Sequence, residues 1–159
     1  MKTVNNSKTN KKSKIVVYRN DIYDCSLVVA NQYVTLEELK KKYMFCDGEE
    51  LNEDVLSGEA STSRCKDINT GEGICLVKYN HDTNVKSKDK FLNFINTVSH
   101  EATHVALDIY ELCNQNICFC SPEPFCYLQG WACECIYKAL KKWITSSWMP
   151  YYFTQITCL

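Results

Sequence analysis

The sequence predicts an α+β fold in which a small, largely antiparallel sheet packs against two long helices. Short β-branched runs bounded by turn residues fill the first half, and apolar residues recur at every third or fourth position in the second half. The chain has 159 residues, 45% of them apolar, which suits one domain with its own core. We expect this domain over residues 14–159, after a polar tail, residues 1–13, that stays disordered because it can bury little.

Composition and charge exclude several classes of protein. Lys and Arg number 18 against 19 Asp and Glu, for a formal charge of −1, so nucleic acid is not an expected partner. No apolar run is long enough to cross a membrane, and no export signal follows the charged start of the chain. We expect a cytoplasmic protein with no membrane partner.

Cysteine is unusually abundant for such a protein, with 11 in the chain. Seven of them crowd residues 113–158, but none shows the Cys-x-x-Cys spacing of zinc fingers. We expect free thiols that pack as small apolar side chains. A thiolate metal cluster in the second half is the alternative.

The first half reads as two hairpins with a helix between them. β-branched residues between Lys14 and Ala30 flank a turn at Arg19-Asn20-Asp21, and residues 61–67 and 73–79 flank a second turn. Thr35-Leu36-Glu37-Glu38 has the spacing of a capping box, which predicts a short helix to about Tyr43. The acidic residues 47–59 are expected to form a solvated loop.

The second half predicts two long amphipathic helices. The first runs from about Lys88 to Cys113, with an apolar stripe that packs on the sheet: Phe91, Ile95, Val98, Ala102, Val105, Ile109 and Leu112. A capping Ser121 and Pro122 open the second, which runs to about Trp143. The aromatic-rich segment from Met149 to Leu159 is expected to pack across the body of the domain.

The first long helix carries the motif His100-Glu101-Ala102-Thr103-His104, a match to His-Glu-x-x-His. Imidazoles four residues apart project from one helical face, so both can bind a single zinc ion at about 2.0–2.1 Å. Glu101 lies about 100° round the helix, within reach of a zinc-bound water without binding the metal. The motif therefore predicts His100 and His104 as metal ligands and Glu101 as the catalytic residue.

A zinc ion held by two histidines needs a third protein ligand, and catalytic sites often use a carboxylate. Glu123 is the favoured candidate, in the first turn of the second long helix. That helix has a polar face with Glu123, Tyr127, Gly130 and Glu134. We expect this face to oppose the histidine face across a cleft, with a close helix approach at Gly130 to compensate the cost of a helical glycine.

Other acidic residues and histidines rank below Glu123. Glu134, His81 or a thiolate remain alternative ligands, whereas Glu111 lies too far along the helix from His104 to bind the same ion. Asp108, one turn beyond His104, is suited to a hydrogen bond that fixes an imidazole tautomer. Tyr127 either donates to the oxyanion of the reaction or packs as an ordinary aromatic residue.

The segment Val98–Tyr110, followed by Glu123–Trp131, resembles the small zincin-like metallopeptidases encoded by tailed bacteriophages and, more distantly, the gluzincins. The resemblance covers roughly residues 74–140. It implies a minimal zincin-like fold, with a small sheet on the motif helix, Glu123 as the matched zinc ligand and, for a phage protein, the host cytoplasm as its location. No oxyanion-stabilising His or Arg is evident downstream.

These residues predict zinc-dependent hydrolysis of a peptide or protein substrate. Zinc lowers the pKa of its bound water, and Glu101 takes the proton as that water attacks the carbonyl group. The alternative is a catalytically silent, zinc-stabilised interaction or regulatory protein. The small size of the chain and its many thiols favour this alternative. A chance motif in a protein without metal is the third possibility.

Overall fold

The computed structural model describes residues 12–81 and 87–141. In chain order its elements are β1 (Ile15–Asn20), β2 (Cys25–Ala30), α1 (Leu36–Lys40), β3 (Tyr43–Phe45), the 3₁₀ helix η1 (Glu53–Leu56), β4 (Ala60–Asp67), β5 (Gly73–Tyr79), α2 (Lys88–Leu112) and α3 (Glu123–Lys141). These elements confirm the predicted α+β class. The expectations for residues 1–11, for Trp143 and for Met149–Leu159 lie outside the described residues.

The five strands form one sheet in the order β1-β2-β5-β4-β3. Both predicted hairpins are present, as the antiparallel pairs β1–β2 and β4–β5. The pair β3–β4 is also antiparallel, but β2 and β5 run parallel, so the sheet is mixed. Parallel neighbours need a long connection, and here the chain between them passes through α1, β3, η1 and β4.

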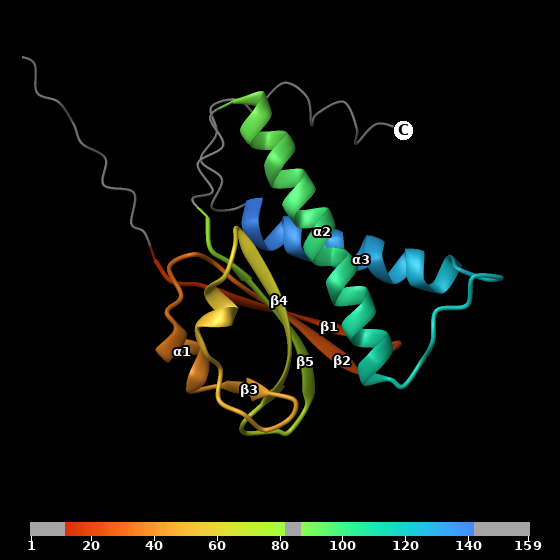
Figure 1. Ribbon diagram of the computed structural model, residues 1–159, viewed down its shortest axis with the longest axis horizontal. Coiled ribbons are helices and arrows are strands. Elements are labelled where there is room, and N and C mark those ends of the chain that lie inside the picture. The colour runs from red at the N-terminus through yellow and green to blue at the C-terminus, as the bar shows by residue number, and fades with distance from the viewer. Residues whose placement is uncertain (1–11, 82–86, 142–159) are drawn as a thin grey trace, which may run out of the picture.

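The sheet has an apolar core on each face. Side chains alternate between the two faces of a strand, so Leu27 and Val77 join the core with α2 and α3, whereas Val28 and Leu76 join the core with α1 and η1. Figure 1 shows the two long helices on one side of the sheet and α1 on the other. The larger core positions α2, the helix that carries the His-Glu-x-x-His motif.

The short helix α1 begins as predicted and ends earlier. Glu38 N donates to Thr35 Oγ1 at 3.2 Å and Thr35 N donates to Glu38 Oε2 at 2.8 Å, which completes the capping box. The helix ends at Lys40, and Tyr43 instead begins β3, opposite Asp67 of β4. A strand of three residues is too short to show a period in the sequence.

The two long helices confirm their predicted apolar faces. Val98, Ala102, Val105 and Ile109 of α2 are at most 2% exposed. On α3 the buried residues are Leu128, Ala132, Cys135, Ile136, Ala139 and Leu140. Neither helix, nor any other in residues 12–81 and 87–141, has the length and apolar character needed to span a membrane.

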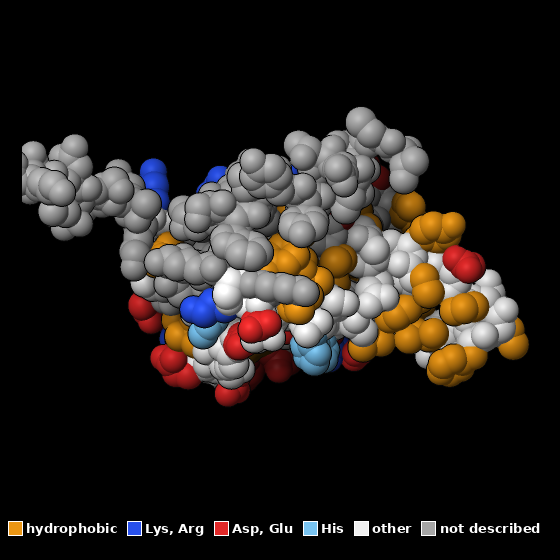
Figure 2. All heavy atoms as spheres, turned by 90° about the horizontal axis from the view of Figure 1, so that it is seen from above, with side chains coloured by type: hydrophobic (Ala, Val, Ile, Leu, Met, Phe, Trp, Pro, Cys, Tyr) orange, Lys and Arg blue, Asp and Glu red, His pale blue; other side chains and the backbone are white. Residues whose placement is uncertain are grey.

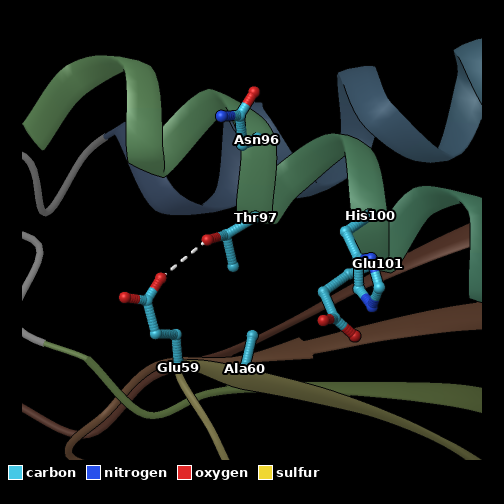
Figure 3. Close-up of a pocket in the computed structure, with 6 residues that line it drawn as sticks. All are labelled: Glu59, Ala60, Asn96, Thr97, His100 and Glu101. Atoms are coloured by element: carbon cyan, nitrogen blue, oxygen red, sulfur yellow. Dashed lines mark hydrogen bonds between the residues drawn. The ribbon is translucent and has the colours of Figure 1, made fainter. Parts of the chain in front are cut away.

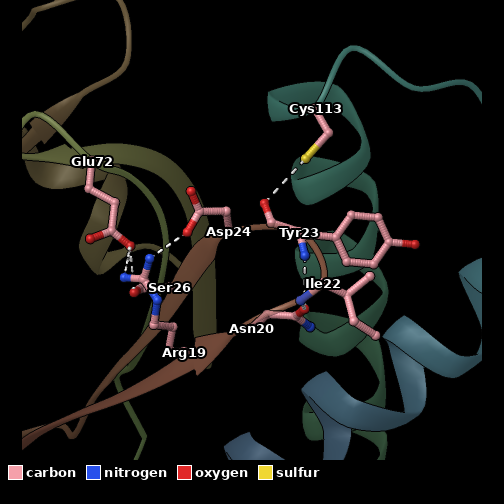
Figure 4. A network of polar contacts seen from close by, with 8 residues as sticks. All are labelled: Arg19, Asn20, Ile22, Tyr23, Asp24, Ser26, Glu72 and Cys113. Carbon is pink, nitrogen blue, oxygen red and sulfur yellow. Dashed lines mark hydrogen bonds and ion pairs between the residues drawn. The ribbon is translucent and has the colours of Figure 1, made fainter.

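The turn between β1 and β2 ties the sheet to the end of α2 (Figure 4). Asn20, which is 8% exposed, accepts hydrogen bonds at its Oδ1 from the N–H groups of Ile22 and Tyr23, both at 3.1 Å. The Cys113 thiol donates to the carbonyl oxygen of Tyr23 at 3.6 Å, and the Tyr23 ring lies 5.9 Å from that of Tyr110. These contacts fix α2 relative to the strands.

Candidate metal centre

His100 and His104 lie one turn apart on the exposed face of α2, and their imidazoles converge. The two Nε2 atoms are 3.0 Å apart, and the ring centroids are 4.7 Å apart with an angle of 74° between the planes. Both side chains are exposed, and Figure 2 shows histidine side chains at the surface next to acidic ones. An ion from solvent can therefore reach both nitrogens.

The histidine pair fits one zinc ion as far as two donors go. Zinc binds imidazole nitrogen at about 2.0–2.1 Å, so one ion can contact both Nε2 atoms at their separation of 3.0 Å. The same separation suits an N–H···N hydrogen bond between the rings. Over the described ranges, no three His, Cys, Asp or Glu side chains form a group that could hold a metal ion. The structure thus brings two of the three predicted ligands together.

Glu101 is buried beside the histidines, with 5% of the residue exposed. Its Oε2 accepts a hydrogen bond from the Thr62 hydroxyl of β4 at 2.6 Å. A carboxylate whose orientation is fixed in this way does not need to be ordered when a substrate binds. Strand β4 therefore orients the predicted catalytic base through Thr62.

A pocket of about 370 Å³ opens between α2 and the start of β4, next to Glu101 (Figure 3). Its lining residues are Glu59, Ala60, Asn96, Thr97, His100 and Glu101. The Thr97 hydroxyl donates to Glu59 Oε2 at 2.9 Å across this space. Because His100 and Glu101 belong to both the motif and the pocket, a molecule in the pocket lies beside the histidine pair.

The polar faces of the two long helices do not face each other across a cleft, so this prediction is wrong. Glu123, Tyr127, Gly130 and Glu134 are all exposed, because α3 turns its apolar face toward α2 and the sheet. Among the described residues, nothing lies within 4 Å of a Cβ atom built on Gly130, so no helix of residues 12–81 and 87–141 approaches closely there. The pocket beside the motif is formed by β4 instead of α3.

The structure does not bring Glu123 to the histidine pair. The contact of α3 with the motif turn is made by Gln129, whose Nε2 donates to Thr103 Oγ1 at 2.7 Å. Glu123 precedes Gln129 by six residues, about 9 Å along a helix axis. Figure 1 shows the first turn of α3 projecting beyond the crossing with α2, and Glu123 there is exposed to solvent.

Asp108 pairs with Arg64 of β4, and no hydrogen bond joins it to either histidine within the described part of the chain. Asp108 Oδ1 lies 3.6 Å from Arg64 Nε, and a second guanidinium nitrogen of Arg64 pairs with Glu111. Burial raises the pKa of Asp108 to about 6, against the opposing charges of Arg64 and His104. The expected role of Asp108 in fixing an imidazole is therefore not seen.

Among the described residues, none of the remaining candidate ligands forms a metal-binding group with the pair. Tyr127 is 75% exposed and does not line the pocket. Glu134 pairs with Lys138 on its own helix. His81 is exposed, and its backbone N–H donates to the carbonyl oxygen of Glu59 at 3.1 Å. The ten cysteines among the described residues are free thiols, and none of them belongs to a possible metal group.

Sequence reasoning missed Glu59 and Thr62, which come from the β4 region and form hydrogen bonds with Thr97 and Glu101 of α2. Glu59 was grouped with the acidic loop, and Thr62 carries no motif. Their role depends on which strand lies under the helix, and no local pattern specifies this.

Comparison of the chain with protein-family models, with curated proteins and with solved structures gave no match.

Proposed function

We propose that the chain is a zinc-dependent peptide hydrolase in which His100 and His104 bind the metal and Glu101 is the general base. The observation that carries the proposal is the convergence of the two Nε2 atoms, 3.0 Å apart. Two features support it. Glu101 is buried and oriented by Thr62, and a pocket able to take part of a substrate adjoins His100.

In this reaction a bound zinc ion would supply Lewis acidity and lower the pKa of water. The Glu101 carboxylate accepts the proton of the attacking water and passes it to the leaving amine nitrogen. The hydroxyl of Thr62 donates to Oε2, and we assign the proton to Oε1, the oxygen without this hydrogen bond. The pocket orients the substrate so that its carbonyl carbon lies near the histidine pair.

The absence of a third protein ligand among the described residues has a consequence for affinity. Zinc in proteins is usually four-coordinate, so two histidines leave the other positions to water and substrate. We expect weaker zinc binding than in a site with three protein ligands. Zinc supplied in the assay buffer should then raise activity until the site is saturated.

The variant Glu101→Gln tests the assigned base. Glutamine keeps the shape and the acceptor for Thr62 but cannot take a proton, so zinc binding should persist while hydrolysis of a fluorescently labelled unfolded protein falls at least about 100-fold. Glu111→Gln is the matched control, because it removes the same charge from an exposed position of the same helix. Parental activity in Glu101→Gln would show that the base is assigned wrongly.

A second candidate function is favoured by the position of Glu123 away from the pair. Without Glu123 the predicted catalytic ligand set is incomplete, and a bound metal would then act by stabilising a surface for a partner in a catalytically silent protein. In that case zinc should raise the melting temperature of the chain, and neither the parent nor Glu101→Gln should cleave peptides. Cobalt substitution adds a check, since thiolate-to-cobalt absorption bands would indicate a closed structural site.

A further inference from the structure

We propose that the pocket beside His100 binds a cationic side chain, that of Lys or Arg, with Glu59 as its anchoring carboxylate. As a statement about substrate this rests on the proposed function, and it names a basic residue next to the peptide bond that is cleaved. As a statement about binding it needs only the pocket.

The charge of the pocket lining favours a cation. Of the six described residues that line it, two are Glu59 and Glu101, and none is Lys or Arg. Figure 3 shows the two glutamates on either side of Ala60, under Asn96 and Thr97 of α2. An anionic side chain would meet two carboxylates here, and an apolar one would desolvate them without compensation.

Hydrogen bonds hold the backbone of Glu59, and one further contact orients its exposed carboxylate. Its carbonyl oxygen accepts hydrogen bonds from the N–H groups of Asn80 at 2.8 Å and His81 at 3.1 Å, and its Oε2 accepts from Thr97 at 2.9 Å. A pair between two freely rotating side chains loses much of its energy to ordering, and a pre-positioned carboxylate avoids part of that loss.

The charge of Glu59 is not neutralised by an ion pair within the described residues. The salt bridges there involve other carboxylates: Asp24, Glu37, Glu50, Glu72, Asp108, Glu111 and Glu134. The carboxylate of Glu59 can therefore pair with a ligand without first breaking an ion pair to another described residue.

The volume of the pocket is large enough for a long side chain. Its volume is about 370 Å³, which leaves room for the aliphatic stem of Lys or Arg against Ala60 and the methyl group of Thr97. A charged head group paired with Glu59 would then keep its stem in the apolar part of the pocket, as long cationic side chains commonly do. His100 lines the same pocket, so the backbone of such a residue would lie close to the histidine pair.

Binding of blocked amino acids to the full-length chain tests the inference without peptide cleavage. The probes are the N-acetyl amides of arginine, norleucine and glutamate, titrated calorimetrically with and without zinc. We expect the arginine amide to bind at least about tenfold more tightly than norleucine amide, and glutamate amide to bind most weakly. Equal affinities for the three probes would overturn the inference.

Variants assign the preference to Glu59. Glu59→Gln should bring arginine amide to the affinity of norleucine amide, whereas Glu49→Gln, which removes a charge from an exposed residue outside the pocket, should keep the parental ratio. Thr97→Val keeps the charge but frees the carboxylate, so an intermediate ratio is expected. A full preference retained in Glu59→Gln would contradict the assignment.

The outcomes separate this inference from the proposed function. Preference for arginine amide that disappears in Glu59→Gln, in a protein that hydrolyses no peptide, would support the cation pocket and refute the hydrolase. Hydrolysis that depends on Glu101 but shows no preference for basic residues would support the hydrolase and refute the cation pocket.

Discussion

The two long helices have the same amphipathic pattern, but their polar faces have different surroundings. The polar face of α2 lies against the β4 region, where Thr62 donates to Glu101 and Glu59 accepts from Thr97. Glu123, Tyr127, Gly130 and Glu134 on the polar face of α3 are exposed, and a Cβ atom on Gly130 would contact no residue that the structure describes.

This difference explains why only one of the helices contributes a candidate site. A polar face can form a site where a second element places complementary groups opposite it and forms a pocket with it. On α2 these groups come from β4, and the pocket adjoins the histidine pair. On α3 the first turn and the α2–α3 loop are instead an exposed end of the molecule, where Figure 2 shows apolar side chains at the surface; Phe119 there is 91% exposed.

The buried faces of the two helices should contribute about equally to the stability of the fold. Truncation of a residue on either face should give the largest loss in the free energy of unfolding. Ile109 of α2 and Ile136 of α3 are at most 1% exposed, so truncation of either to Ala should lower the free energy of unfolding by about 2–5 kcal/mol. Leu107→Ala is the control on α2, since Leu107 is 40% exposed and should cost less than about 1 kcal/mol. Urea unfolding measures all three.

A loss below about 1 kcal/mol in one of the two isoleucine variants would contradict the view that both helices are anchored by their apolar faces. The helix with the small loss would then pack less closely than the structure shows.

Asp108 on the polar face of α2 should give a pH dependence that α3 lacks. Burial raises its pKa from 3.8 to about 6 in the folded state, so its protonated form is the one that the fold favours. The resulting stabilisation is complete below the unfolded pKa and is lost as pH rises through about 6. The stability of Asp108→Asn relative to the parent should therefore rise by about 1–3 kcal/mol between pH 4 and pH 7.5.

Urea unfolding at both pH values, in buffer with a chelator, measures this shift. Glu134→Gln is the control, because Glu134 is exposed and pairs only with Lys138 among the described salt bridges. A difference between Asp108→Asn and the parent that stays constant with pH would show that Asp108 is not desolvated.

Gly130 offers the smallest effect and the most direct test of the open polar face of α3. A helical glycine costs about 0.5–1 kcal/mol relative to Ala, and no atom of the described part of the chain lies within 4 Å of where a Cβ atom would be. Gly130→Ala should therefore stabilise the protein by that amount in thermal or urea unfolding. Destabilisation would indicate that another element packs against this face, as the sequence led us to expect.

The elements of the fold could largely be predicted because their signals are local. The apolar stripe of α2, the capping box of α1 and the turn residues of the two hairpins each lie within a few residues of one another. The strand β3 was not predicted because three residues show no period. The parallel pairing of β2 with β5 was not predicted because it joins segments that are far apart in the chain.

The site was predictable only as far as the helix itself determines it. Spacing alone brings His100 and His104 together and places Glu101 on an adjacent part of the helix surface. The choice of Glu123 depended on the crossing of α2 and α3 and on the rotation of α3 about its axis. The periodic pattern shows which face of α3 is apolar but not where its first turn lies relative to the motif.

Calorimetric titration of the full-length chain with zinc tests the central claim most directly, with His104→Ala and Glu123→Gln measured alongside the parent. We expect about one zinc ion per chain in the parent, loss of binding in His104→Ala, and parental affinity in Glu123→Gln. A parent that binds no zinc would contradict a metal centre at the histidine pair. Loss of binding in Glu123→Gln as complete as in His104→Ala would contradict the two-histidine site and show that the first turn of α3 reaches the metal.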